Sequence, residues 1–251
     1  MENLAPLSGL WIIALLIIVL ASTIQGITGF GAALLSGPTL TLFLEPKLVV
    51  VIIMVTAMSN LLCVAYNARH YIFPSRVLPL IVPAVFGVPL GSYILHKVSS
   101  SITGLSIAII SILFSILLLL GYSRPFKREA VVSTGFGFAS GVMCAGVGMG
   151  GPPIILFLSN QGWPKEIFRA TVAIHFLFIA SLTIASYMFT GVVTGSRAIV
   201  SISLSPAAVI GFYLGNVMFH RINAFFFTRF ALSLILFNGL ASLAINIAKM
   251  L

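Results

Sequence analysis

Residues 87–98 read GVPLGSYILHKV, and residues 211–222 read GFYLGNVMFHRI. Glycine, leucine, glycine and histidine recur at the same places, each 124 positions after its first occurrence. Small differences in offset are expected when two copies of one unit have gained or lost a few residues. The chain is therefore predicted to contain a duplicated unit, and two further matches at offsets of 119 and 118 support it: Gly29-Phe30-Gly31-Ala32 with Gly148-Met149-Gly150-Gly151, and Pro46-Lys47 with Pro164-Lys165.

The composition is typical of a protein whose surface faces lipid. Of the 251 residues, 60% are apolar and 7% are charged, and the mean hydropathy is +1.19. A soluble domain carries about 25% charged residues, so this chain could not cover a water-facing surface. The apolar runs are continuous and do not alternate as barrel strands do. We expect an all-α polytopic membrane protein whose solvent is the lipid bilayer, with no cofactor and no nucleic-acid partner.

Two apolar runs are too short for an upright crossing, which takes about 20 residues. These are the second and the seventh runs, and both follow a glycine-rich stretch. The natural interpretation is a helical hairpin, in which a helix runs inward, breaks at glycine and a short helix returns. The ten apolar runs lie at about 7–26, 31–44, 48–67, 77–95, 102–121, 130–146, 152–160, 168–190, 197–218 and 226–248.

Each half of the chain is thus predicted to be one glycine-broken hairpin followed by three transmembrane helices. The N-terminal repeat covers 1–121 with its hairpin at 7–44, and the C-terminal repeat covers 130–251 with its hairpin at 130–160. A polar linker, 122–129, joins them. Repeats of this kind have inverted topology, and the chain would have 8–10 membrane segments in all.

The distribution of basic residues favours inverted repeats. The chain has thirteen Lys and Arg against four acidic residues, a net charge of +9. If each half is a hairpin followed by three spans and the linker is in the cytoplasm, nine basic residues fall inside and four outside. If each hairpin is instead a single span and the repeats are parallel, the division is seven to six. The first division satisfies the positive-inside rule and places both chain ends outside. The excess of positive charge has two interpretations, either this orientation signal or an anionic cargo.

The two glycine-rich stretches are the candidate binding site. Glycine allows backbone angles that other residues avoid, and proline fits the first turn of a new helix. A fresh helix N-terminus offers free N–H groups and partial positive charge, which can hold an anion. Unsatisfied backbone must be buried in protein or line a wet cavity, although close helix packing would also explain glycine here. The predicted substrate-binding glycines are Gly29, Gly31, Gly148, Gly150 and Gly151.

Few polar side chains lie within the apolar runs, and such residues are often functional. Gln25 and Thr28 flank the first break, Asn60 lies within the third run, and His175 lies deep in the eighth run. All four are candidate substrate-binding residues, and His175 is also the candidate for proton coupling because it titrates near neutral pH. Hydrogen bonding between helices is the alternative. No cluster of residues suggests a metal site.

At the two breaks the sequence resembles the TauE/SafE sulfite exporter family, also called the 4-toluene sulfonate uptake permeases. The resemblance rests on Gly29-Phe30-Gly31 with Pro38, and on Gly148-Met149-Gly150-Gly151-Pro152-Pro153. The turns Glu45-Pro46-Lys47 and Gly162-Trp163-Pro164-Lys165 also look like those of the family. The resemblance covers nearly the whole chain, and it implies export or uptake of sulfur-containing anions such as sulfite, sulfoacetate or sulfonates.

The pairs Gly87/Gly91 and Gly211/Gly215 are small-residue motifs of the kind that bring helices close together. We expect them to pack helices within the fold, and homodimerisation is the lower-ranked alternative.

The leading hypothesis is a secondary transporter for a small anion, integral to a bacterial-type cytoplasmic membrane and working by alternating access. An anion channel is the alternative. An enzyme is not expected, because the chain has no Asp and no convincing nucleophile with a base within its spans.

Overall fold

The computed structural model describes residues 9–121, 129–219 and 224–248. Within these residues the chain forms ten α-helices and one short 3₁₀-helix. Each of the ten apolar runs predicted from the sequence corresponds to one α-helix. The helices are α1 (Gly9–Thr28), α2 (Ala32–Leu40), α3 (Pro46–Ala68), η2 (Arg69–Tyr71), α4 (Pro74–Lys97), α5 (Ser100–Leu120), α6 (Glu129–Val147), α7 (Gly151–Gln161), α8 (Lys165–Thr190), α9 (Gly195–Phe219) and α10 (Ala224–Ala248).

Glycine ends the first helix of each hairpin, as the sequence predicts. Gly29 and Gly31 adopt left-handed backbone angles after α1 (φ +84° and +98°), and Gly148 does so after α6 (φ +77°). A side chain is strained at such angles, whereas glycine is not. The break in the first hairpin is further held by Thr28, whose hydroxyl accepts the N–H of Phe30 at 3.2 Å and lies 2.8 Å from the carbonyl oxygen of Ile24.

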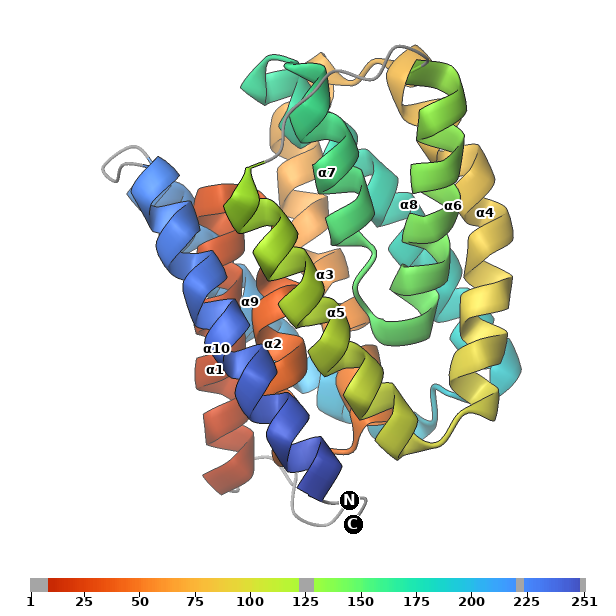
Figure 1. The fold of residues 1–251 in the computed structure, drawn as a ribbon, viewed down its shortest axis with the longest axis vertical. Coiled ribbons are helices and arrows are strands. Elements are labelled where there is room, and N and C mark those ends of the chain that lie inside the picture. The colour runs from red at the N-terminus through yellow and green to blue at the C-terminus, as the bar shows by residue number, and fades with distance from the viewer. Residues whose placement is uncertain (1–8, 122–128, 220–223, 249–251) are drawn as a thin grey trace.

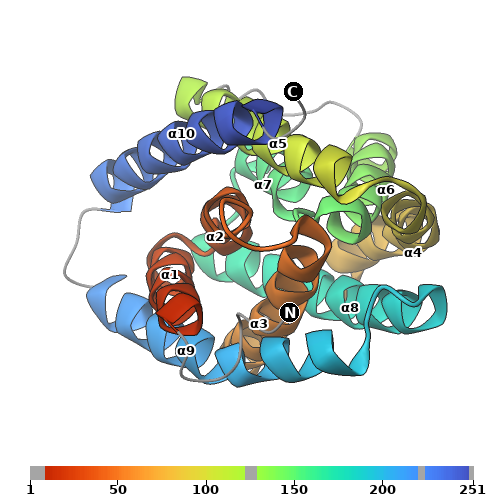
Figure 2. The same cartoon turned by 90° about the horizontal axis from the view of Figure 1, so that it is seen from below.

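The returning helices are too short to cross a bilayer. Helix α2 has 9 residues and α7 has 11. At 1.5 Å per residue they are about 14 Å and 17 Å long, against a hydrocarbon core of about 30 Å. Both hairpins therefore turn back inside the molecule. Seen along the helices, α2 and α7 lie in the interior and the longer helices surround them (Figure 2).

The two hairpins open toward opposite ends of the molecule. Helices α1 and α3 begin at the lower end of Figure 1, and α6 and α8 begin at the upper end. Helix α10 ends at the lower end, where α1 begins. The upper end carries Arg69, Arg76 and the start of α8, and the lower end carries Glu45 and the start of α9.

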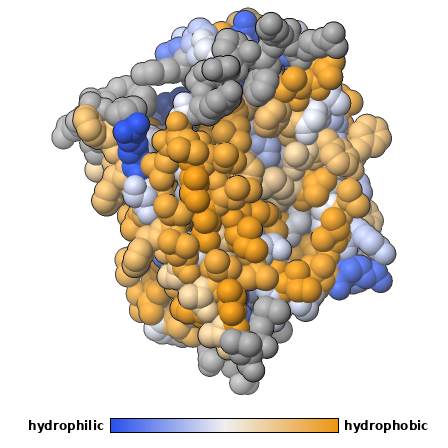
Figure 3. Space-filling model, viewed as in Figure 1, coloured by the Kyte–Doolittle hydropathy of each residue, from blue (hydrophilic) through white to orange (hydrophobic). Residues whose placement is uncertain are grey.

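Seven helices of the described residues are long and apolar enough to span a membrane. The prediction of 8–10 membrane segments also counted the hairpin arms, of which α2, α7 and the apolar part of α6 (Val131–Val147) are shorter. Large apolar side chains cover the outside, including Leu16, Phe86 and Phe237, and Figure 3 shows hydrophobic residues over the middle of the visible face. The seven helices are Gly9–Thr28, Pro46–Tyr66, Pro74–Lys97, Ser100–Leu120, Glu166–Thr190, Gly195–Met218 and Phe226–Ala248.

The long arm of each hairpin packs against a helix from the other half of the chain. Gly87 and Gly91 of α4 lie directly on the backbone of α6, next to Val142. Gly211 and Gly215 of α9 lie in the same way on the backbone of α1. The prediction that these motifs pack helices within the fold is confirmed. His220 of the second motif and most of the predicted linker (122–128) lie outside the described residues.

These contacts predict an unequal response to alanine. At Gly215 a new Cβ would lie 2.9 Å from the Cα of Gly26 and closer still to the carbonyl oxygen of Thr23. Gly215→Ala should destabilise the protein by about 1–3 kcal/mol through overpacking. Gly135→Ala in α6, with no atom within 4 Å, is the matched control. Thermal unfolding in detergent compares the two variants, and equal melting temperatures would contradict the assigned packing.

Candidate functional site

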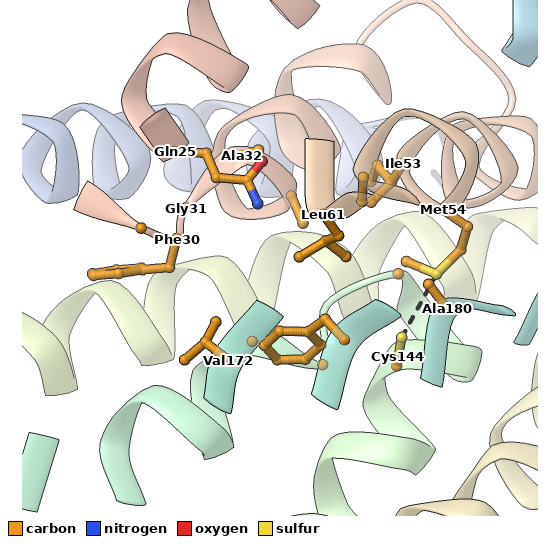
Figure 4. A pocket seen from close by; sticks show the side chains of 17 residues that line it. Gln25, Phe30, Gly31, Ala32, Ile53, Met54, Leu61, Cys144, Val172 and Ala180 are labelled. Atoms are coloured by element: carbon orange, nitrogen blue, oxygen red, sulfur yellow. Dashed lines mark hydrogen bonds between the residues drawn. The ribbon is translucent and has the colours of Figure 1, made fainter. Parts of the chain in front are cut away.

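The two glycine breaks meet at one internal cavity (Figure 4). Its volume is about 70 Å³, whereas one water needs about 10–15 Å³. The cavity thus has room for a small anion or a few waters. Six of the predicted site residues line it, together with apolar side chains from the first break and from α2, α3, α6 and α8. The lining residues are Gln25, Gly29, Phe30, Gly31, Ala32, Ala33, Ile53, Met54, Ala57, Leu61, Cys144, Gly148, Gly150, Gly151, Val172, Phe176 and Ala180.

The first break presents the N-terminus of α2 to the cavity. Gly31 caps this helix, and Ala32 and Ala33 are its first two residues. The N–H groups at the start of a helix have no partner within the helix itself. They carry partial positive charge and point away from the helix, into the space that these residues line.

The second break presents the N-terminus of α7, with fewer donors. Gly150 caps the helix, and Gly151 is followed by Pro152 and Pro153. Proline has no N–H, so Gly151 supplies the single backbone donor of the first three residues. The two breaks are therefore unequal, and the first offers more main-chain donors.

A buried side-chain network orients Gln25. Asn60 is fully buried, and its Nδ2 donates to Gln25 Oε1 at 3.0 Å and to Ser22 Oγ at 3.1 Å. Because its oxygen is occupied in this way, Gln25 turns its amide nitrogen into the cavity, as Figure 4 shows. Asn60 itself does not line the cavity and acts on it through Gln25.

The backbone acceptors nearest the breaks have partners within the protein. The carbonyl oxygen of Gln25 accepts the N–H of Gly29 at 2.7 Å, and that of Cys144 accepts the N–H of Gly148 at 3.0 Å. The hydroxyl of the buried Tyr187 donates to the carbonyl oxygen of Ala145 at 2.6 Å. These carbonyl groups are the ones that would repel an anion. The breaks thus retain their donors and satisfy these acceptors.

Besides Asn60, two further predicted site residues lie outside the cavity lining. The hydroxyl of Thr28 is used locally to hold the first break. His175 is fully buried in α8, and its Nε2 lies 3.0 Å from Ser140 Oγ. Ser140 in turn donates to the carbonyl oxygen of Gly150 at 2.8 Å, so His175 reaches the second break through one intermediate side chain. Direct substrate binding and proton coupling by His175 stay predictions.

None of the described residues that line this cavity carries a charge. A second, smaller cavity has a cationic side chain, Arg169, in its lining together with Val64 and Phe212. The two cavities share Gln25 and Gly29, so the second one continues the first toward the upper end. One guanidinium nitrogen of Arg169 donates to Asn216 Oδ1 at 3.3 Å.

Sequence reasoning missed Ser140 and Ser22, the two serines that tie each long hairpin arm to its neighbour. A signal was present, since these serines are separated by 118 positions, the offset that relates Pro46 to Pro164. Met54 and Cys144 were also missed as lining residues, because apolar residues are too frequent in this chain to stand out.

Helices that span a membrane around two broken hairpins, with a donor-lined cavity between the breaks, define a membrane transport protein. A comparison with protein families gives the same class: the family model described as "Sulfite exporter TauE/SafE" matches residues 14–242. The chain belongs to the TauE/SafE family and is a membrane transporter of sulfur-containing anions, not an enzyme. No curated protein and no solved structure gives a significant match.

The space around the second break predicts a contrast between adjacent glycines. A Cβ at Gly150 would lie 2.7 Å from the Cβ of Cys144 and 2.8 Å from the carbonyl oxygen of Ser140, whereas one at Gly151 meets no atom within 4 Å. Gly150→Ala should destabilise the protein by about 1–3 kcal/mol, and Gly151→Ala should leave its melting temperature unchanged. The same loss in both variants would show that the break has a different conformation.

Proposed function

We propose that the protein is a secondary transporter that moves a small monovalent sulfur oxyanion across a bacterial-type cytoplasmic membrane by alternating access. The observation that carries the proposal is the convergence of two helix N-termini and the Gln25 amide on one cavity inside the bundle. These groups are hydrogen-bond donors, and helix N-termini stabilise anions without a charged side chain.

The uncharged lining favours one negative charge over two. Moving an ion out of water costs several kcal/mol even after the protein relaxes, and the cost rises with the square of the charge. A few N–H groups offset this cost for a monoanion more readily than for sulfate. We therefore assign the cavity to hydrogensulfite or a short alkanesulfonate.

The cavity wall suits an anion that has an apolar part. Phe30, Phe176 and Leu61 line the same cavity as the donors, and Met54 and Cys144 add polarizable sulfur. A sulfonate head on the donors would place a short alkyl group against these side chains. This division of the surface favours organosulfonates among the anions that the family suggests.

The second cavity supports a path to the upper end. It runs from Gln25 and Gly29 to Arg169, and its lining is otherwise apolar. We propose that Arg169 attracts the anion at the mouth of this path. By the positive-inside rule the upper end is cytoplasmic, so the described conformation communicates with the cytoplasm.

Matched contacts at the two ends support an inverted repeat. Arg197 is the third residue of α9, and it forms an ion pair of 2.9 Å with Glu45, just before Pro46-Lys47. Arg76 is the third residue of α4, and its guanidinium lies 4.6 Å from the ring centre of Trp163, just before Pro164-Lys165. Each arginine thus fastens one half of the chain to the turn after the hairpin of the other half.

Alternating access requires the contacts of these two arginines to break in turn, one at each end of the molecule. At the lower end Glu45 also accepts from Ser100 at 3.1 Å, and Arg197 donates to the carbonyl oxygen of Val192 at 2.8 Å. Opening toward the lower end would separate this group.

An anion channel is the second candidate, and saturable counterflow in liposomes distinguishes the transporter from the ohmic current of a channel. Proton coupling and homodimerisation stay predictions.

The protein should bind monovalent anions more tightly than divalent ones, and binding should require the open space beside Gly151. Methanesulfonate and hydrogensulfite should raise the melting temperature of the purified protein more than sulfate does, at equal concentration and ionic strength. Gly151→Val should weaken methanesulfonate binding at least about tenfold, because its side chain occupies the cavity. A thermal-shift titration measures both effects.

The matched control for this titration is Gly135→Val, on a part of α6 that has no neighbour within 4 Å. It should bind as the wild type does. A larger shift with sulfate than with methanesulfonate, or full binding by Gly151→Val, would refute the assigned site.

Weakening the lower-end ion pair should favour opening toward that end. Cys144 lines the cavity and serves as a reporter in a Cys63→Ser background. Glu45→Gln should raise the rate at which a membrane-impermeant thiol reagent labels Cys144 from the lower-end side, by about two- to fivefold for a partly exposed pair. Glu129→Gln, at the exposed start of α6, is the control. An unchanged rate in Glu45→Gln would exclude the ion pair as a closing contact.

A further inference from the structure

The peptide unit between Gly150 and Gly151 is held by a hydrogen bond from a residue that does not line the cavity. The hydroxyl of Ser140, in α6, donates to the carbonyl oxygen of Gly150 at 2.8 Å. Ser140 is fully buried and does not line the cavity. Its hydrogen bond therefore fixes the direction of this carbonyl group from the side opposite to the proposed anion.

Fixing the carbonyl group also fixes a donor. A peptide unit is planar, and in the trans form its C=O and N–H bonds point in opposite directions. The described residues contain no cis peptide bond. Holding the oxygen of Gly150 against Ser140 therefore aims the N–H of Gly151 the other way, on the side of the cavity that Gly151 lines.

This N–H group has no substitute in α7. The next two residues are Pro152 and Pro153, which cannot donate. The N–H of Gly151 is thus the one main-chain donor that the first three residues of α7 can offer. A rotation of this single peptide unit would remove it and turn a carbonyl oxygen toward an anion instead.

His175 completes the arrangement from α8. A serine hydroxyl has one proton, and that of Ser140 is directed at Gly150. The contact of 3.0 Å between Ser140 Oγ and His175 Nε2 therefore requires the proton to be on Nε2, with Ser140 as acceptor. The ring is fully buried, and its edge packs against Phe176 with 4.9 Å between ring centres.

We propose that His175 is a positioning residue for anion binding: it donates to Ser140, Ser140 donates to the carbonyl oxygen of Gly150, and the N–H of Gly151 is thereby aimed at a sulfonate or sulfite oxygen in the cavity. The proposal rests on the anion site proposed above. It differs from substrate contact and from proton coupling, because what it requires of residue 175 is a neutral N–H donor at the place of Nε2.

Glutamine separates these roles, since its Nε2 can donate from a similar distance and the side chain does not titrate. Methanesulfonate affinity should fall about tenfold in both Ser140→Ala and His175→Ala, the size expected when one directed hydrogen bond is lost. His175→Gln should remain within about twofold of the wild type. The double variant Ser140→Ala/His175→Ala should lose no more than either single variant, because both act through the same peptide unit.

Hydrogen exchange without any anion gives an independent measure. The backbone of residues 148–151 should exchange faster in Ser140→Ala and His175→Ala than in the wild type, and His175→Gln should restore the slow rate. Ser115→Ala is the control, since this buried serine bonds to the carbonyl oxygen of Ser111 within α5. It should change neither the affinity nor the exchange rate.

Three results would overturn the assignment. They are wild-type affinity in Ser140→Ala, a loss in His175→Gln equal to that in His175→Ala, or additive losses in the double variant. If the wild-type protein binds none of the anions, the proposed function itself fails and this assignment fails with it. Binding by the wild type together with any of the three results overturns the role of His175 alone.

Discussion

Backbone polar groups in a bilayer must find partners, and this constraint governs the architecture of the protein. A helix satisfies the requirement internally, whereas a broken helix does not. The breaks after Thr28 and Val147 each leave N–H and C=O groups at membrane depth. Their carbonyl groups are satisfied by nearby N–H and hydroxyl groups, including those of Gly29 and Tyr187. The N–H groups that remain face a shared cavity, and this supports the proposed anion site without any charged side chain in the lining.

The same constraint explains why the two halves are interlocked. A short returning helix such as α2 or α7 cannot form a stable unit in lipid and needs protein on all sides. The long arms α1 and α6 are held by glycine contacts with α9 and α4, helices that belong to the opposite half of the chain. Lipid tails are as apolar as the helix surfaces, so the hydrophobic effect does not drive helices together in a bilayer. Close backbone approach of this kind stabilises their association instead. Each half of the chain therefore depends on the other half for the packing of its hairpin.

Much of this fold could be predicted from the sequence. The ten apolar runs, the short returning arms and the internal packing of Gly87 and Gly215 all follow from run length and residue size. The choice of helix partners could not be predicted, because the pairing of α4 with α6 and of α1 with α9 depends on three-dimensional contacts that periodicity does not encode. Without that pairing, the sequence could not reveal which faces of the helices line the cavity.

The candidate site was predictable to a similar degree. The glycines and Gln25 were identified because glycine at a helix break and an amide in an apolar run are rare. Thr28 instead uses its hydroxyl locally, since threonine side chains compete for nearby backbone groups. His175 was found by its depth, but its connection to Gly150 depends on Ser140, and a serine within a membrane helix is too common to be singled out.

Crystals grown with selenite, a heavier analogue of sulfite, would test the central claim most directly. The anomalous signal of selenium would locate the anion without reference to any assumed site. We expect one strong peak between the N-termini of α2 and α7, within hydrogen-bonding distance of the N–H of Gly151 and the amide of Gln25. A peak elsewhere in the molecule with an empty cavity would contradict the account.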